Sequence, residues 1–147
     1  SPRSREVIRA WQHLANAKLI PGSYTGALNL SGGLYKFGVN IPAFSGILGY
    51  FLLSDVTPWQ GRTGNAITFG KEHISSFPNE GALTPAEMQQ LDDKIDDGEA
   101  QFGNFMALEA LATGTAYSGD CTTGDATAYE YALISDVEGC YSKLYFD

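Results

Sequence analysis

Basic side chains are scarce in this sequence. Its 147 residues include nine Lys and Arg against 17 Asp and Glu, which gives a formal net charge of −8 at pH 7. A nucleic-acid-binding protein needs a basic face to displace counterions from phosphates, and docking on an anionic bilayer needs basic clusters. The charge balance therefore argues against both functions. It favours a well-solvated surface that would meet cations or basic partners.

Long hydrophobic runs are also missing. A membrane-spanning helix needs about 18 or more consecutive apolar residues, and the apolar stretch 47–53 is much shorter. We interpret this stretch as a buried strand or a turn of helix. The sequence shows no signal peptide and opens on Ser1-Pro2 instead of methionine. We therefore expect that an upstream segment has been removed.

Motifs for catalysis and for phosphate binding are absent. The two histidines, His13 and His73, stand outside any Gly-x-Ser-x-Gly or His-Glu-x-x-His pattern. The glycine-containing segments 30–33 and 61–64 match neither the P-loop nor the Rossmann spacing. We therefore expect that the protein is not an enzyme. A small hydrolase with paired carboxylates is the alternative, because the separation of two carboxylates is a property of the folded chain.

Cysteine occurs only at Cys121 and Cys140, near the C-terminal end. Two thiols without a histidine cluster do not supply the four ligands of a zinc site, and neither cysteine belongs to a CxxC motif. We predict one structural disulfide in an oxidising compartment. It would close a loop of about 20 residues and stabilise the fold by roughly 3 kcal/mol. The alternative is two unpaired buried thiols in a cytosolic protein.

The first segment, about Ser4 to Lys18, has the pattern of an amphipathic helix. Apolar residues recur there at spacings of three and four, which places them on one face. Pro21-Gly22 follows and would end the helix. The residues that we expect to pack this face against the rest of the fold are Val7, Ile8, Trp11 and Leu14.

The remainder predicts one α+β domain, because no repeat, charge block or linker divides the chain. Glycine recurs every few residues between 22 and 81, which favours short strands and loops. We expect loops over 57–61, 75–81 and 113–125. Residues 102–111 could form either a strand or a loop. The predicted strands are Phe51–Val56, Ala66–Phe69, Tyr129–Ile134 and Tyr141–Phe146.

A second helix is predicted from Pro85 to Asp97. Thr84 and Glu87 have the spacing of a capping box, and proline stands at the first helical position. Gly98 would supply a left-handed C-terminal cap. The residues expected on the apolar face are Met88, Leu91 and Ile95.

Four aspartates crowd the end of this helix, where the helix dipole is already negative. Asp92 and Asp96, like Asp93 and Asp97, form repulsive pairs at spacing i,i+4, and only Lys94 lies among them. A cation, a basic residue from elsewhere or backbone N–H groups of the next loop should compensate. Calcium is one candidate, because it takes carboxylate and carbonyl oxygens. The other interpretations are a structural cap, a contact between subunits, or a solvated face.

A second acidic pocket could form around Asp120 and Asp125 in the glycine-rich loop beside Cys121, although Asp and Gly are also ordinary turn formers. Trp59 and Tyr35 could stack on a sugar, although isolated aromatic residues more often form a small apolar cluster. These features keep open a secreted module that binds calcium or a glycan.

Two stretches resemble type IV pilin-like proteins. Residues 9–26 contain Trp11, Leu14, Ala17, Leu19-Ile20 and Gly22 in a W-x-x-L-x-x-A-x-L-I-x-G pattern, which in these proteins closes the long N-terminal helix. Residues 83–98 run from Leu-Thr-Pro to Asp-Asp-Lys-Ile-Asp-Asp-Gly and resemble a later element of the same proteins. The two stretches occur in the order of the family, and a disulfide near the C-terminus is also common in pilins.

This resemblance implies a structural subunit, either a minor pilin or a type II secretion-like pseudopilin. Residues 1–20 would be the C-terminal half of a spine helix packed on an antiparallel sheet, and 21–147 would be the head with an inserted second helix. The expected partners are other pilin or pseudopilin subunits, together with the inner membrane through the missing N-terminal helix. The head would lie in the periplasm before assembly, and in an extracellular or periplasmic fibre afterwards.

Overall fold

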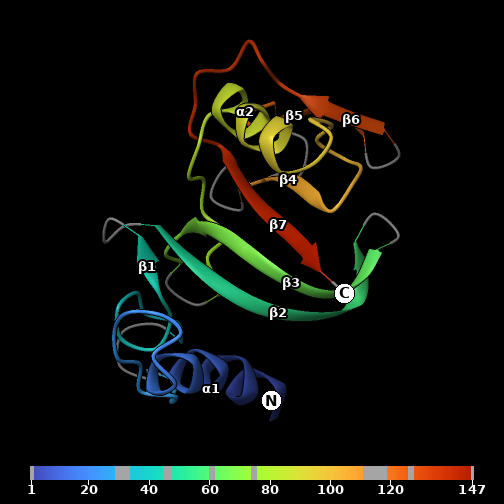
Figure 1. Cartoon of the computed structure of the whole chain (residues 1–147). Coiled ribbons are helices and arrows are strands. Elements are labelled where there is room, and N and C mark those ends of the chain that lie inside the picture. Colours follow the sequence, from blue (N-terminus) through green and yellow to red (C-terminus); the bar gives the residue numbers. More distant parts are fainter. Residues whose placement is uncertain are drawn as a thin grey trace.

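The computed structural model describes residues 2–28, 34–44, 48–59, 62–73, 76–110, 119–125 and 128–146. These residues form an α+β fold with two helices and antiparallel sheets, as the sequence predicts (Figure 1). The elements in chain order are α1 (Pro2–Asn16), β1 (Ala43–Phe44), β2 (Leu48–Trp59), β3 (Arg62–Lys71), α2 (Pro85–Ile95), β4 (Phe105–Glu109), β5 (Thr122–Asp125), β6 (Ala128–Tyr131) and β7 (Cys140–Phe146).

The main sheet has the strand order β1-β2-β3-β7-β4, and all neighbouring strands are antiparallel. The long β2–β3 hairpin forms one half. The C-terminal strand β7 lies between β3 and β4, so the last residues of the chain are paired on both sides. Strands β5 and β6 form a separate two-stranded sheet.

The two helices lie on opposite sides of the main sheet (Figure 1). Gly49 of β2 pairs with Gly70 of β3, and the Phe37 ring from the α1 side covers Gly49. Leu144 of β7 points to the other face, where it packs against the cluster around Met88 of α2. Because successive side chains of a strand alternate between faces, the sheet separates an α1 layer from an α2 layer.

Helix α1 buries the stripe that its sequence predicts. Ile8 is fully buried and Trp11 nearly so, and Trp11 packs with Ile41 at the centre of an apolar cluster. Val7 and Leu14 are half-buried against this cluster. Figure 1 shows α1 lying beside β2. Among the described residues, no helix combines the length and the apolar character needed to cross a membrane.

Helix α2 begins as predicted. The Thr84 hydroxyl accepts a hydrogen bond from the Glu87 N–H, and the Glu87 carboxylate accepts one from the Thr84 N–H at 3.0 Å. This capping box satisfies two backbone donors that the first helical turn would leave free. Met88 is fully buried in the core cluster that α2 shares with β4, β6 and the disulfide.

The predicted disulfide between Cys121 and Cys140 is confirmed, with 4.8 Å between the two Cα atoms. It joins the residue before β5 to the first residue of β7. The Cys140 backbone also exchanges hydrogen bonds with the segment before α2, through Ala82 and Leu83. The disulfide therefore holds the small β5–β6 sheet and the start of α2 to the main sheet.

Several predicted boundaries are wrong. β2 continues through part of the loop expected over 57–61, because it pairs with β3 as far as Trp59, and a register irregularity between Asp55 and Trp59 accommodates Pro58. Residues 60 and 61 of that loop lie outside the described residues. Helix α2 ends at Ile95, two residues earlier than predicted, although Gly98 has the expected positive φ of 77°.

The C-terminal half differs from prediction in two further respects, and it resolves one ambiguous segment. Residues 122–125 of the expected loop form β5, because they pair with β6, and 113–118 lie outside the described residues. Strand β6 ends at Tyr131, which leaves Ile134 fully exposed instead of in a strand. Residues 105–109 of the ambiguous segment form β4, which pairs with β7 at the edge of the sheet.

Candidate metal centre at the end of helix α2

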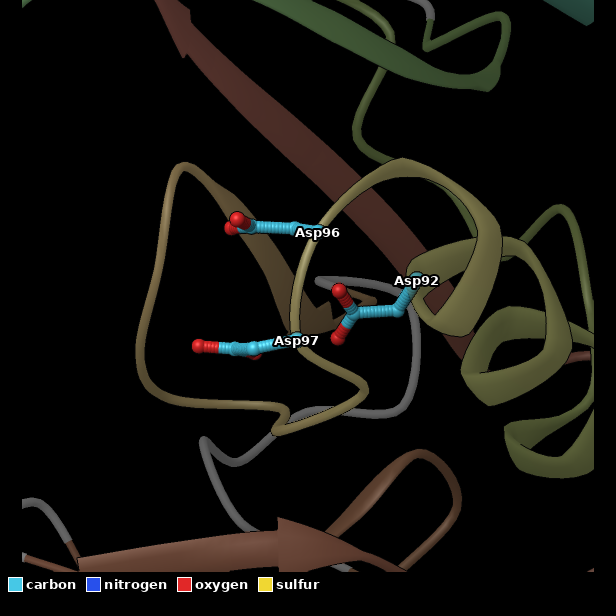
Figure 2. A group of neighbouring side chains, drawn as sticks. All are labelled: Asp92, Asp96 and Asp97. Atoms are coloured by element: carbon cyan, nitrogen blue, oxygen red, sulfur yellow. The ribbon is translucent and has the colours of Figure 1, made fainter.

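Three aspartates from the end of α2 and the residues that follow it lie together. One carboxylate oxygen from each of Asp92, Asp96 and Asp97 lies within 4.8 Å of the others. In Figure 2 the Asp92 side chain points from the helix toward the chain segment that carries Asp96 and Asp97, and the side chains of these two residues point into the turn that follows. The sequence predicts a group of four. The fourth, Asp93, is exposed and lies against Gly98 outside this group.

Asp92 is fully buried, on the side of α2 that faces the small sheet. Its Oδ2 atom accepts a hydrogen bond from the Tyr131 hydroxyl at 2.8 Å. Its Oδ1 atom has no hydrogen-bond partner. The helical spacing predicts Ile95 on the buried face, but Ile95 is 47% exposed. The helix ends earlier than predicted, so Ile95 is its last residue and is exposed. Asp92, one turn earlier, is buried instead.

The environment of Asp92 disfavours its charge. Burial raises the pKa of this carboxyl to about 6, with a smaller contribution from the charges of Asp97 and Asp96. The Tyr131 hydroxyl and the Gly98 N–H act in the opposite direction and lower the pKa. The pKa of Tyr131 is raised, first by burial and then by its hydrogen bond to Asp92. A bound cation would stabilise the ionised form of Asp92.

Asp96 and Asp97 meet backbone N–H groups of the next loop, which is one of the compensations expected from the sequence. Asp96 Oδ2 accepts hydrogen bonds from the N–H groups of Asn104 and Phe105, the latter at 2.9 Å. Asp97 Oδ1 accepts one from the Glu99 N–H at 2.9 Å. A carboxylate has about four lone-pair sites, so these bonds leave acceptor capacity for a cation.

Gly103 brings the loop close to the carboxylates. A Cβ atom at this position would lie 1.9 Å from Asp96 Oδ2 and 2.8 Å from Asp97 Oδ2. The φ of Gly103 is 73°, in the left-handed region that favours glycine. At Gly103 the loop therefore approaches Asp96 and Asp97 so closely that a side chain at this position would not fit.

Much of the glycine-rich loop that would complete the second acidic pocket, around Asp120 and Asp125, lies outside the described residues. Strand β5 separates the two residues, with Asp120 before it and Asp125 at its end. Asp125 accepts a hydrogen bond from the Ala128 N–H in the β5–β6 turn, which is the ordinary turn role of aspartate. Asp120 lies against Gly139. In the described part of the chain, neither residue belongs to a cluster with ligand spacing.

A carboxylate that the sequence analysis missed lies at the end of β4. Glu109 accepts hydrogen bonds from the N–H groups of Asp120, Cys121 and Thr122, at 3.0 to 3.1 Å. It thereby fixes the disulfide segment to the main sheet. No local pattern marks this residue, because its partners lie 11 to 13 positions away. Tyr131 was missed for the same reason, although alternation along β6 places Tyr129 and Tyr131 on the buried face.

The other candidate residues have ordinary environments. His13 is exposed, and His73 lies 3.5 Å from a carboxylate oxygen of Glu80. Tyr35 packs in the apolar cluster of Trp11, as the simpler interpretation of this aromatic residue expects. The side chain of Trp59 lies outside the described residues. A groove of 380 Å³ beside the acidic group has Glu99 and Glu130 in its lining, and both are exposed.

The three aspartates would offer only oxygen ligands to a cation. Among the described residues, no Lys, Arg or His forms an ion pair with them. Calcium and magnesium take oxygen ligands of this kind, whereas zinc and copper prefer the nitrogen and sulfur ligands that the group lacks.

Comparisons of the chain with protein-family models, with curated proteins and with solved structures find no significant match.

Proposed function

We propose that this chain is the head of a structural subunit of a type IV pilus or a type II secretion-like pseudopilus. In this proposal α1 continues the spine helix of the subunit, and residues 21–147 form the head that decorates the fibre. The partners are neighbouring subunits and, before assembly, the inner membrane. The resemblance of residues 9–26 and 83–98 to pilin-like proteins is the reason for this choice.

The observation that supports the proposal most directly is the packing of α1. Ile8 and Trp11 are buried on the side of the helix that faces the head, and Trp11 packs with Ile41. A fibre subunit needs this arrangement, because the spine must transmit force to the head without separating from it. Arg5, Glu6 and Arg9 lie exposed on the same helix and are available for contacts with neighbouring subunits.

The disulfide supports the same proposal from the other end of the chain. Cys121 and Cys140 hold the C-terminal region to the sheet, and β7 is paired on both sides. These features resist shear and proteolysis, which a filament outside the cytoplasm experiences. With α1 inside a fibre, α2 and the acidic group would lie on the far side of the sheet from the fibre core.

The test is to express the full-length gene product from its own promoter in the host and to fractionate the cells. The proposal predicts about 20 apolar residues just before Ser1, a membrane-bound precursor, and mature protein in the fibre fraction sheared from the cells. Deletion of the prepilin peptidase gene is the control and should leave only the precursor. A product without the apolar segment, found only in the culture supernatant in both strains, would rule out a fibre subunit.

The acidic group at the end of α2 favours a second candidate, a secreted calcium-binding module. The same fractionation separates the two functions. A secreted module would appear in the supernatant independently of the peptidase, whereas a fibre subunit requires it.

A further inference from the structure

We propose that Asp92, Asp96 and Asp97 bind a calcium ion, and that this ion holds the loop 98–104 on the end of α2. The proposal concerns the isolated head and does not depend on the assembly of fibres. It rests on the spacing of the three carboxylates, on the buried unpartnered oxygen of Asp92, and on the approach of the loop to the other two.

The unpartnered oxygen is the observation that points to a ligand. Asp92 is fully buried, and its Oδ1 atom has no hydrogen-bond partner while Oδ2 is bonded to Tyr131. Buried polar atoms are nearly always paired, so an orphan acceptor calls for an ion or a water molecule. The Asp92 side chain points toward the chain that carries Asp96 and Asp97 (Figure 2). A cation between the three would satisfy the orphan oxygen and remove the mutual repulsion of the carboxylates.

The spacing of the carboxylates fits calcium without rearrangement. Calcium binds oxygen at about 2.3–2.6 Å, so two of its ligands lie up to about 5 Å apart. The separations within this group, up to 4.8 Å, fall inside that limit. Magnesium binds oxygen at about 2.0–2.1 Å in a strict octahedron. Two of its ligands can be no more than about 4.2 Å apart, so it would require the carboxylates to move together. Water and backbone carbonyl groups would complete the coordination shell of calcium.

The structural consequence concerns the loop that follows α2. Asp96 already binds the N–H groups of Asn104 and Phe105 at the start of β4, and Asp97 binds that of Glu99. An ion held by the same carboxylates would link α2, this loop and β4 into one unit. Because Asp92 also bonds Tyr131, the small β5–β6 sheet would join that unit. Calcium would therefore stabilise the whole α2 layer of the head.

The primary experiment is isothermal titration calorimetry of the disulfide-intact chain, freed of metal by chelating resin, with calcium chloride and separately with magnesium chloride. We expect saturable calcium binding at one site and much weaker binding of magnesium. The melting temperature should rise by about 5–10 °C at a calcium concentration 100 times the dissociation constant. No binding heat and no change in melting temperature at 5 mM calcium, in folded protein, would overturn the proposal.

Three variants locate the site. Asp92→Asn and Asp97→Asn should each weaken calcium binding at least tenfold. Asp93→Asn is the matched control, since it removes the same charge from the same helix but outside the group, and its affinity should stay within about threefold of the parent. Equal weakening in Asp93→Asn and Asp97→Asn would show a diffuse ion atmosphere and overturn the assigned site. Asp97 is exposed, so its variant provides the test if Asp92→Asn fails to fold.

Terbium luminescence gives an independent measurement at the buried end of the site. Terbium replaces calcium at oxygen sites and is excited by transfer from a nearby tyrosine. The Tyr131 hydroxyl lies 2.8 Å from Asp92 Oδ2, so bound terbium should emit when tyrosine is excited. Added calcium should displace terbium and reduce this emission. Tyr131→Phe should remove most of the emission while terbium still binds. Full emission from that variant would place the ion elsewhere and contradict the proposal.

Discussion

The hydroxyl group of Tyr131 lies 2.8 Å from Oδ2 of Asp92, and both side chains are buried. This hydrogen bond joins the small β5–β6 sheet to helix α2 across 39 positions of sequence. It also satisfies only one of the two oxygens of a carboxylate that is closed off from solvent. The stability of the α2 layer should therefore be sensitive to both residues.

Removal of the Tyr131 hydroxyl should destabilise the fold. In Tyr131→Phe the ring remains, but Oδ2 of the buried Asp92 carboxylate loses the hydrogen bond from the Tyr131 hydroxyl. We expect the free energy of unfolding in chelator to fall by about 1–3 kcal/mol, measured by urea denaturation. Tyr24→Phe is the control, since the Tyr24 hydroxyl bonds the Pro21 carbonyl at an exposed position. An equal loss in both variants would contradict a special role for Tyr131.

The stability of the calcium-free protein should decrease as the pH rises. Burial raises the pKa of Asp92 from its ordinary 3.8 to about 6 in the folded protein. Between these two values the folded chain binds more protons than the unfolded chain, so the free energy of unfolding falls as pH increases. The full penalty is present above pH 6 and is relieved below about pH 4. The difference between the two pKa values corresponds to at most about 3 kcal/mol.

The measurement that isolates this effect compares the parent with Asp92→Asn, both in chelator, by urea denaturation between pH 4 and pH 7.5. The other carboxylates are common to both proteins, so the difference in unfolding free energy reports the change at Asp92. We expect the parent to lose stability relative to the variant as the pH rises. A difference that stays constant across the range would show that Asp92 does not titrate as proposed.

Loss of the disulfide should cost about 3 kcal/mol of stability, because it closes a loop of about 20 residues and its removal frees the unfolded chain. The double variant Cys121→Ala, Cys140→Ala and the reduced parent should show the same decrease in urea midpoint. Glu109 holds the same segment through three backbone N–H groups. We therefore expect the double variant to keep β5 in place, as seen by hydrogen exchange at Thr122. Complete loss of protection there would contradict an independent role for Glu109.

Truncation of Trp11 should release α1 from the head. Trp11→Ala removes the largest side chain of the cluster that joins the helix to Ile41, which should cost about 3–5 kcal/mol. Limited proteolysis should then cut within residues 12–28 sooner than in the parent, while the disulfide-linked part resists. Arg9→Ala is the control, since Arg9 is exposed on the same helix. Similar cleavage of the two variants would show that the cluster does not hold α1.

Local features of this fold follow from the sequence to a large extent. The capping box at Thr84 and Glu87 and the apolar stripe of α1 each depend on residues three or four positions apart. The disulfide follows because the chain has only two cysteines to pair. The C-terminal strand is also predicted, because the expected range Tyr141–Phe146 covers six of the seven residues of β7. Such signals are visible without knowledge of the tertiary structure.

The accumulation of aspartates at the end of α2, where the helix dipole makes them unfavourable, can be read from neighbouring residues alone. Which of these aspartates is buried depends on contacts that form when the chain folds. Asp92 is buried and accepts a hydrogen bond from Tyr131, 39 positions away, whereas Asp93, the next residue, is exposed. The physical reason is that burial and hydrogen bonding depend on partners far along the chain. Charge and helical spacing, by contrast, are properties of the neighbouring residues alone.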